Sequence, residues 1–280
     1  MRVKHRLTQK DIREYSESGL TPFVWCIRGA VPNHVFEGVV TMCEICDARL
    51  SSRRDFLSVA TSGAVFGLAM TTVPAFASGG PTTTVTPDEA LGKLKAGNEK
   101  YVKGPELCAR ELNNQRDKTA KGQTPWATIV SCADSRVPPE LLFGGLGVGE
   151  LFVARNAGNM ADTATMGTIE YGAAVLGIPL IVVLGHERCG AVAAACEVVE
   201  KNTKFPSSIK PMVDAIVPAA KAVKGKPGDF VDNAVRESAK RTALKIASAS
   251  PIVADLIKKG KVKVVAGRYD LDDGKVEIFA

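Results

Sequence analysis

The sequence predicts an α/β fold with a mainly parallel central β-sheet flanked by helices, an N-terminal helical arm and a C-terminal hairpin. Apolar runs at 127–131, 150–154 and 180–185 have the length of buried strands, and sequence typical of helices follows them. Strands that alternate with helices indicate a parallel sheet, whose crossover connections are helical. At 280 residues, the chain is long enough for one such domain of about 200 residues plus additional sequence.

The first element of this domain is a helix that begins at Thr86 and ends near Gly104. Thr86–Glu89 forms a capping box with proline at the first helical position. Leu91 and Leu94 then lie on one face of the helix. Residues 118–125 are polar, and we expect them to form a loop before the strand at 127–131.

The remaining elements follow from the same patterns. A short helix is predicted over 137–142, strands over 150–154 and 180–185, and helices over 165–176, 191–199, 209–224, 229–249 and 252–259. Strands over 262–269 and 275–279 form the closing hairpin across Asp272-Asp273-Gly274. No predicted helix after residue 77 is long and apolar enough to span a membrane.

Composition and charge exclude several classes of protein. The chain carries 36 basic and 30 acidic residues, for a net charge of +6, and 6% of its residues are aromatic. Because it has no basic cluster, we expect no nucleic-acid partner. Its seven cysteines are scattered without a regular framework, which argues against a small fold held by disulfides.

Residues 1–41 form an unassigned leader without sustained periodicity. One hypothesis is that Met42 is the true start and that the leader is not translated. Cys43 and Cys46 form a C-x-x-C pair that could indicate metal or redox chemistry. No second pair accompanies them, so we assign no function there.

Residues 42–77 resemble a twin-arginine export signal. Arg53-Arg54 is followed by Phe56-Leu57 at the appropriate offset. A moderately apolar stretch at 59–73 is too short to span a bilayer, and Ala75-Phe76-Ala77 supplies a cleavage site. The sequence therefore predicts export to the periplasm or the extracellular space, with cleavage near Ala77.

An ordinary amphipathic helix is the alternative for this segment, but Gly63 and Gly67 disfavour it. Residues 78–85 are a linker rich in glycine, proline and threonine. The folded domain is predicted to occupy residues 86–280.

Polar side chains follow two of the predicted strands. Cys132, Asp134 and Arg136 follow the strand at 127–131, and His186 and Cys189 follow the strand at 180–185. Because parallel strands deliver their carboxyl ends to one edge of a sheet, we expect the two cysteines and the histidine to meet there. Each cysteine alone would more often be inert core, but together they supply three ligands for a catalytic zinc with an open fourth position.

Four motifs occur along this part of the chain: CADSRVPPE at 132–140, RNAGN at 155–159, IEYG at 169–172 and GHERCGA at 185–191. They resemble those of the β-class carbonic anhydrases, in the same order and at matching spacing. The resemblance extends from about Thr86 to the C-terminus. Ala133 stands where serine or threonine is usual, and Glu187-Arg188 fill two variable positions, so no ligand is lost.

The resemblance implies one Zn²⁺ per subunit, held by Cys132, His186 and Cys189. It also implies reversible hydration of CO₂ to bicarbonate and a proton, through attack by zinc-bound hydroxide. Asp134, kept ionised by Arg136, would accept the hydrogen bond of that hydroxide.

The resemblance further implies a substrate site and an assembly. Gln123 would donate a hydrogen bond to substrate oxygen. Phe152, Ala157 and Tyr171 would line an apolar CO₂ pocket, often across a dimer interface, although each could equally be core. The helix that begins at Gly190 would direct backbone N–H groups toward bicarbonate. A homodimer, or a multiple of dimers, is expected.

Two other functions remain open at this point. A related zinc hydrolase that acts on CS₂ or COS would retain every motif. A structural or binding zinc protein is disfavoured, because closed zinc sites use four protein ligands and no fourth cysteine or histidine lies near either motif.

Overall fold

The computed structural model of the chain describes residues 82–110 and 119–279. The leader, the export signal, the Cys43–Cys46 pair and the first part of the linker lie outside these residues. Within the described stretches, no helix combines the length and the apolar character that crossing a membrane requires.

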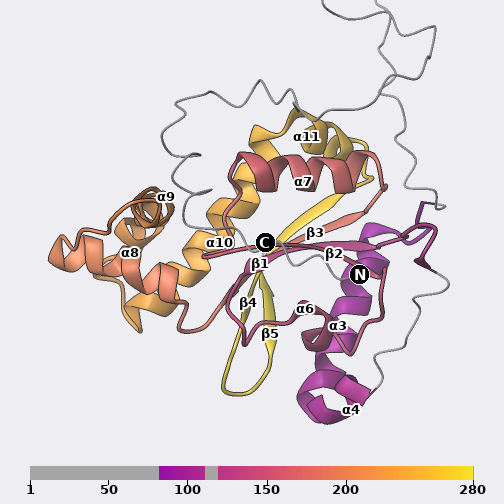
Figure 1. The fold of residues 1–280 in the computed structure, drawn as a ribbon, viewed down its shortest axis with the longest axis horizontal. Helices are drawn as coiled ribbons and strands as arrows, with labels where there is room; N and C mark the ends of the chain where they lie inside the picture. The colour runs from indigo at the N-terminus through magenta and orange to yellow at the C-terminus, as the bar shows by residue number, and fades with distance from the viewer. Residues whose placement is uncertain (1–81, 111–118, 280) are drawn as a thin grey trace, which may run out of the picture. The chain divides into compact units, whose positions relative to one another are not determined.

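The described residues form a five-stranded sheet in the order β2-β1-β3-β4-β5 (Figure 1). The first four strands are parallel to their neighbours, and β5 pairs antiparallel with β4 as the closing hairpin. This confirms the predicted fold class. The strands are β1 (Ala127–Cys132), β2 (Leu151–Asn156), β3 (Leu180–His186), β4 (Lys263–Tyr269) and β5 (Val276–Phe279).

Helices cover both faces of this sheet (Figure 1). The helices of the described residues are α3 (Pro87–Lys103), α4 (Pro105–Arg110), α6 (Pro139–Leu142), α7 (Thr163–Ala174), α8 (Gly190–Lys201), α9 (Ile209–Val223), α10 (Phe230–Ala249) and α11 (Pro251–Lys258). Side chains alternate along a strand, so β3 contributes to both layers. Leu180, Val182 and Leu184 pack with α3, whereas Ile181 and Val183 pack with α7, α10 and α11.

A third apolar cluster lies past the carboxyl ends of β1 and β3. It is built from α8, α9 and α10, and it includes Cys132 and Cys189. The predicted metal ligands therefore lie where strand ends meet this helical cluster, which shields them from water.

The helical arm α3 is joined to the sheet through a buried asparagine. Its N-terminus has the predicted capping box, in which Thr86 and Glu89 exchange hydrogen bonds. Farther along, the Asn98 amide donates to the carbonyl oxygens of Leu142 and Gly274 and accepts from the Val276 N–H. One side chain thus fixes α3 to both α6 and the hairpin.

Several predicted bounds differ from the observed ones by one or two residues, and two differences have a clear physical cause. Strand β2 continues to Asn156, two residues beyond the predicted end, because parallel pairing with β1 persists as far as Cys132 and Asn156. Helix α4 was not predicted. It has only six residues and begins with a proline, so it is too short to show a helical period.

Candidate metal centre

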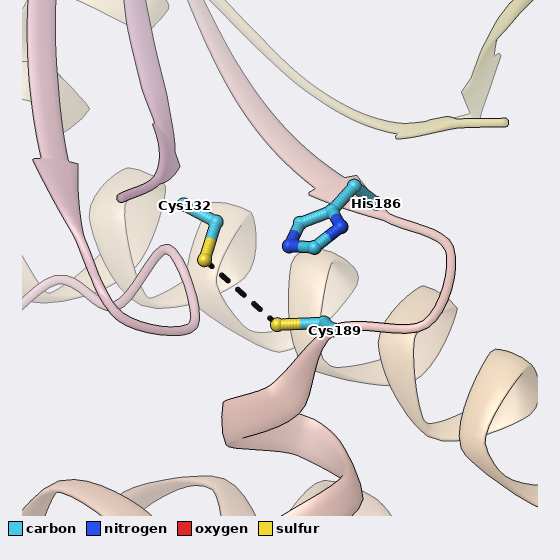
Figure 2. A group of neighbouring side chains, drawn as sticks. All are labelled: Cys132, His186 and Cys189. Atoms are coloured by element: carbon cyan, nitrogen blue, oxygen red, sulfur yellow. Dashed lines mark hydrogen bonds between the residues drawn. The ribbon is translucent and has the colours of Figure 1, made fainter. Parts of the chain in front are cut away.

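Two neighbouring parallel strands bring the candidate ligands together. Cys132 is the last residue of β1, and His186 is the last residue of β3. Three residues after His186, Cys189 is the N-cap of α8. The chain therefore presents the three side chains from two strand ends and one helix start (Figure 2).

The three side chains converge on one point. One ligand atom from each of Cys132, His186 and Cys189 lies within 4.8 Å of the other two, and the two sulfur atoms are 3.9 Å apart. Figure 2 shows the imidazole and both thiols directed toward the same space. All three residues are buried, with at most 5% of their surface exposed.

The imidazole of His186 presents a free lone pair to this space. Its Nδ1 lies 2.9 Å from the carbonyl oxygen of Glu187. Because a carbonyl can only accept, Nδ1 donates this hydrogen bond and carries the proton. In the neutral imidazole the buried Nε2 is then unprotonated, and it has no hydrogen-bond partner among the described residues. A metal ion satisfies such an atom.

The sulfur atoms of the two cysteines share one hydrogen bond, which shifts their pKa values in opposite directions. The hydrogen bond from the Cys189 thiol is the largest cause that lowers the pKa of Cys132 to about 4. The same bond, followed by burial, raises the pKa of Cys189 far above its ordinary value. A divalent cation displaces the remaining proton from such a pair. Two sulfurs and one imidazole nitrogen suit Zn²⁺, so the residues fit this ion.

Asp134 and Arg136 lie beside the cluster and pair with each other. The guanidinium donates from Nε to Oδ1 at 2.9 Å and from Nη2 to Oδ2 at 2.8 Å, and the Arg136 backbone N–H also donates to Oδ1. These bonds, chiefly those from the Arg136 side chain, hold the pKa of Asp134 well below its ordinary value. Oδ2 lies 3.9 Å from Nε2 of His186, so an ionised carboxylate borders the space between the ligands.

Comparison with known proteins agrees with this geometry. A family model described as carbonic anhydrase matches residues 127–276. Carbonic anhydrase 2 of Mycobacterium tuberculosis is 36% identical over 189 residues, which cover 68% of this chain and 91% of the relative. The solved β-carbonic anhydrase CcaA is 25% identical, with a TM-score of 0.52 over 68% of this chain and 95% of its own. The chain belongs to the β-class carbonic anhydrase family.

A tetrameric β-carbonic anhydrase of Sordaria macrospora shares the fold at 22% identity. Its TM-score is 0.53, and the match covers 69% of this chain and 96% of that one. β-Carbonic anhydrases are zinc enzymes, and in this member the group of Cys132, His186 and Cys189 can hold the ion.

Arg155 supports the site in a way that the sequence analysis missed. Its Nε donates to the carbonyl oxygen of Cys132 at 2.9 Å, and its Nη2 donates to that of Asp134 at 2.6 Å. It therefore fixes the backbone that carries both functional side chains of the β-carbonic anhydrase motif. The parallel register, which aligns Arg155 with Ser131, is the signal that would have identified it.

The loop after β2 makes a second such contact. Asn156 closes this loop by exchanging hydrogen bonds with the backbone of Met160. The Gly158 N–H then points at Cys132 and lies 3.4 Å from its sulfur. The RNAGN motif thus supports the Cys132 side of the candidate centre from an adjacent strand.

The predicted substrate residues do not all lie near the metal ligands. Gln123 precedes β1 and is half-buried, so a whole strand separates it from Cys132. Phe152 pairs in register with Thr128, four residues before Cys132, and its ring lies 6.3 Å from that of Tyr171. Within one chain, this aromatic pair is about 13 Å along the strands from the metal ligands.

The other two predicted substrate residues lie nearer the ligands. Ala157 follows β2 and lines a cavity of about 490 Å³ with residues of α9 and α10, but none of the three metal-ligand residues lines it. Gly190 is the first residue of α8, directly after Cys189, and it is exposed. A Cβ added there would meet no described atom within 4 Å, so the space over this helix start is open.

Proposed function

We propose that this β-carbonic anhydrase hydrates CO₂ reversibly to bicarbonate and a proton, with one Zn²⁺ held by Cys132, His186 and Cys189. The observation that carries the proposal is the buried Nε2 of His186, which lacks a partner among the described residues and faces two thiols. Oδ2 of the ionised Asp134 lies 3.9 Å from the same nitrogen. No feature of the described residues favours CS₂ or COS as the substrate.

The chain's own residues orient the reaction. When bound, zinc with three protein ligands lowers the pKa of a water in its fourth position and so supplies a nucleophile at neutral pH. Asp134, kept ionised by Arg136, can only accept hydrogen bonds. Its Oδ2 accepts one hydrogen bond from Arg136 and retains a lone pair that would accept a hydrogen bond from a water or hydroxide beside the ligand group.

Metal analysis and stopped-flow CO₂ hydration of the full-length chain test this function. We expect one zinc per chain and an activity that chelation removes. Cys132→Ala and His186→Ala should each lose both zinc and activity. Cys196→Ala is the matched control, because Cys196 is buried in α8, outside the ligand group. A zinc-free variant that remains active would contradict the ligand assignment.

We further propose that a homodimer completes the substrate pocket. Gln123 and the Phe152–Tyr171 pair lie too far along the strands to reach the ligands of their own chain. Strand β2 is an edge of the described sheet, and Tyr171 on α7 is 36% exposed. A second copy that packs against β2 and α7 would bring these residues to the opposite metal centre.

Subunit mixing tests this arrangement. Cys132→Ala and Gln123→Ala are each expected to be inactive alone. If Gln123 acts across the interface, a mixed dimer contains one intact site, and an equal mixture should recover about a quarter of the wild-type activity. A mixture that stays inactive, although mixed dimers form, would place Gln123 in the site of its own chain.

The sequence also supports a proposal of export through the twin-arginine route, with cleavage near Ala77 and a periplasmic or extracellular location. Arg53-Arg54 and the A-x-A site are the supporting features. Replacing both arginines with lysine should retain an active, unprocessed precursor in the cytoplasm. Unchanged export of this variant would indicate a different route.

A further inference from the structure

Glu187 and Arg188 occupy the two positions between the metal ligands His186 and Cys189. Arg188 adopts a left-handed backbone conformation, with φ of +52°. This conformation is uncommon for a residue with a side chain and persists where surrounding contacts hold it. The contacts here come from the turn between β4 and β5.

Glu187 makes three contacts that bear on His186. Its carbonyl oxygen accepts the Nδ1 hydrogen bond of the imidazole. Its backbone N–H donates to the carbonyl oxygen of Tyr269, at the end of β4. Its carboxylate Oε2 accepts the backbone N–H of Leu271 at 3.1 Å. The peptide group that orients the imidazole is therefore anchored to the hairpin through both backbone and side chain.

Charge pairs secure the same loop. Oε1 of Glu187 lies 3.3 Å from Nη1 of Arg188 and 3.6 Å from Nη2 of Arg268. The Arg188 guanidinium also forms two bonds with Asp272 in the turn, at 2.6 and 3.0 Å. Glu187 and Arg268 are mostly buried, with 18% and 11% of their side chains exposed, whereas Asp272 is 70% exposed. The Glu187 contacts should therefore matter more than the Arg188–Asp272 pair.

A cation site is the alternative use of these carboxylates, because Glu187, Asp270 and Asp272 lie close together. Their oxygens are already occupied. Arg188 pairs with Asp272 and Glu187, Arg268 pairs with Asp270, and backbone N–H groups bind Asp270 and Glu187. Each of the three carboxylates pairs with an arginine, so the cluster is organised as a support rather than as a cation site.

We infer that Glu187 is a positioning residue for the metal centre, held in place by the β4–β5 turn, and that the Arg188–Asp272 pair stabilises the loop that carries it. The inference rests on the proposed zinc function. Since Glu187 fixes the carbonyl that orients His186, its loss should free the imidazole to rotate and should weaken metal retention. Outer contacts of this kind typically change metal affinity by about 10–100-fold.

The test measures the rate at which zinc passes from the full-length protein to a chelator. Glu187→Ala should release zinc about 10–100-fold faster than the wild type. Glu187→Gln keeps an oxygen that can accept from Leu271, so it should show a smaller increase. Asp255→Asn is the control, because it removes a carboxylate of α11 from an exposed ion pair with Lys259, the C-cap of that helix. The rate of zinc release from this variant should not change.

A double-mutant cycle tests the outer pair. Arg188→Ala and Asp272→Ala should each accelerate release by about 2–5-fold, and the double variant should release zinc no faster than the more affected single variant. The melting temperature of the metal-free protein and the absorption spectrum of the Co²⁺-substituted protein separate positioning from folding. Positioning predicts that the spectrum of the Glu187→Gln protein is altered at temperatures well below the melting temperature of this variant.

Two sets of results would overturn the inference. If the wild type binds zinc and hydrates CO₂ but Glu187→Ala releases zinc at the wild-type rate, Glu187 has no positioning role and the proposed function stands. If the wild type binds no zinc, both fail. If Glu187→Ala does not fold, Glu187→Gln and the double-mutant cycle decide, and wild-type release rates in all of them would refute the inference.

Discussion

Gly158→Ala should destabilise the protein by about 2–4 kcal/mol. Gly158 has φ of +84°, a conformation that costs a residue with a Cβ about 1–2 kcal/mol. A Cβ there would lie 2.6 Å from Cδ1 of Ile216 and 3.3 Å from Cβ of Ala191. Overpacking of this kind costs about 1–3 kcal/mol, and the flexible end of Ile216 places the cost in the lower part of that range.

Urea unfolding of the metal-free protein, followed by circular dichroism at one protein concentration, measures this cost. Gly92→Ala is the matched control, because Gly92 lies inside α3 with no atom within 4 Å of an added Cβ. It should stabilise by about 0.5–1 kcal/mol. Gly158→Ala should also release zinc faster, since the Gly158 N–H contacts the Cys132 sulfur. A Gly158→Ala protein as stable as the wild type would refute the reasoning.

Three further predictions concern charge and protons. Asp134→Asn should retain zinc while CO₂ hydration falls at least about tenfold, and an equal loss of zinc would instead make Asp134 a ligand or a folding element. The bond from Arg268 lowers the pKa of Asp270 to about 2 from an ordinary 3.8, so its stabilisation is present above about pH 4 and is lost as pH falls toward 2. At neutral pH, Asp270→Asn should therefore lower the free energy of unfolding by about 1 kcal/mol after solvent screening. At pH 2, the stability of the variant should approach that of the wild type. An equal loss of stability at both pH values would contradict this prediction. His186 is the only histidine after residue 77, so no other histidine there can carry protons away from the site. The maximal hydration rate should therefore rise with added imidazole over about 1–50 mM. A rate that does not change with imidazole would reveal a proton relay within the protein.

Local signals in the sequence were sufficient to predict most of the fold and the ligand group. The capping box at Thr86, the apolar strands and the residues directly after them are encoded within a few positions of one another. Parallel strands then bring Cys132 and His186 to one edge without further information. Two features could not be predicted from local signals. Helix α4 is too short for its sequence to show helical periodicity, and the contacts of Arg155 depend on the register between β1 and β2.

The support of His186 illustrates the same limit over a longer distance. Glu187 and Leu271 are 84 positions apart, and nothing local to either residue indicates that a carboxylate between two ligands binds a backbone N–H of the hairpin. A free carboxylate next to a metal ligand would be a natural candidate to carry protons. In the folded chain this carboxylate is occupied by Leu271 and lies near two arginines.

The position of Gln123 shows that a family resemblance can identify a substrate-binding residue without indicating which subunit's site it serves. A strand of six residues rises about 20 Å, and β1 has that length between Gln123 and the metal ligands. A side chain of Gln123 cannot span this distance within its own chain. If Gln123 binds substrate, as the family resemblance implies, a second chain must contribute it. The catalytic unit would then be the dimer, and dissociation into monomers would abolish hydration while each chain kept its zinc.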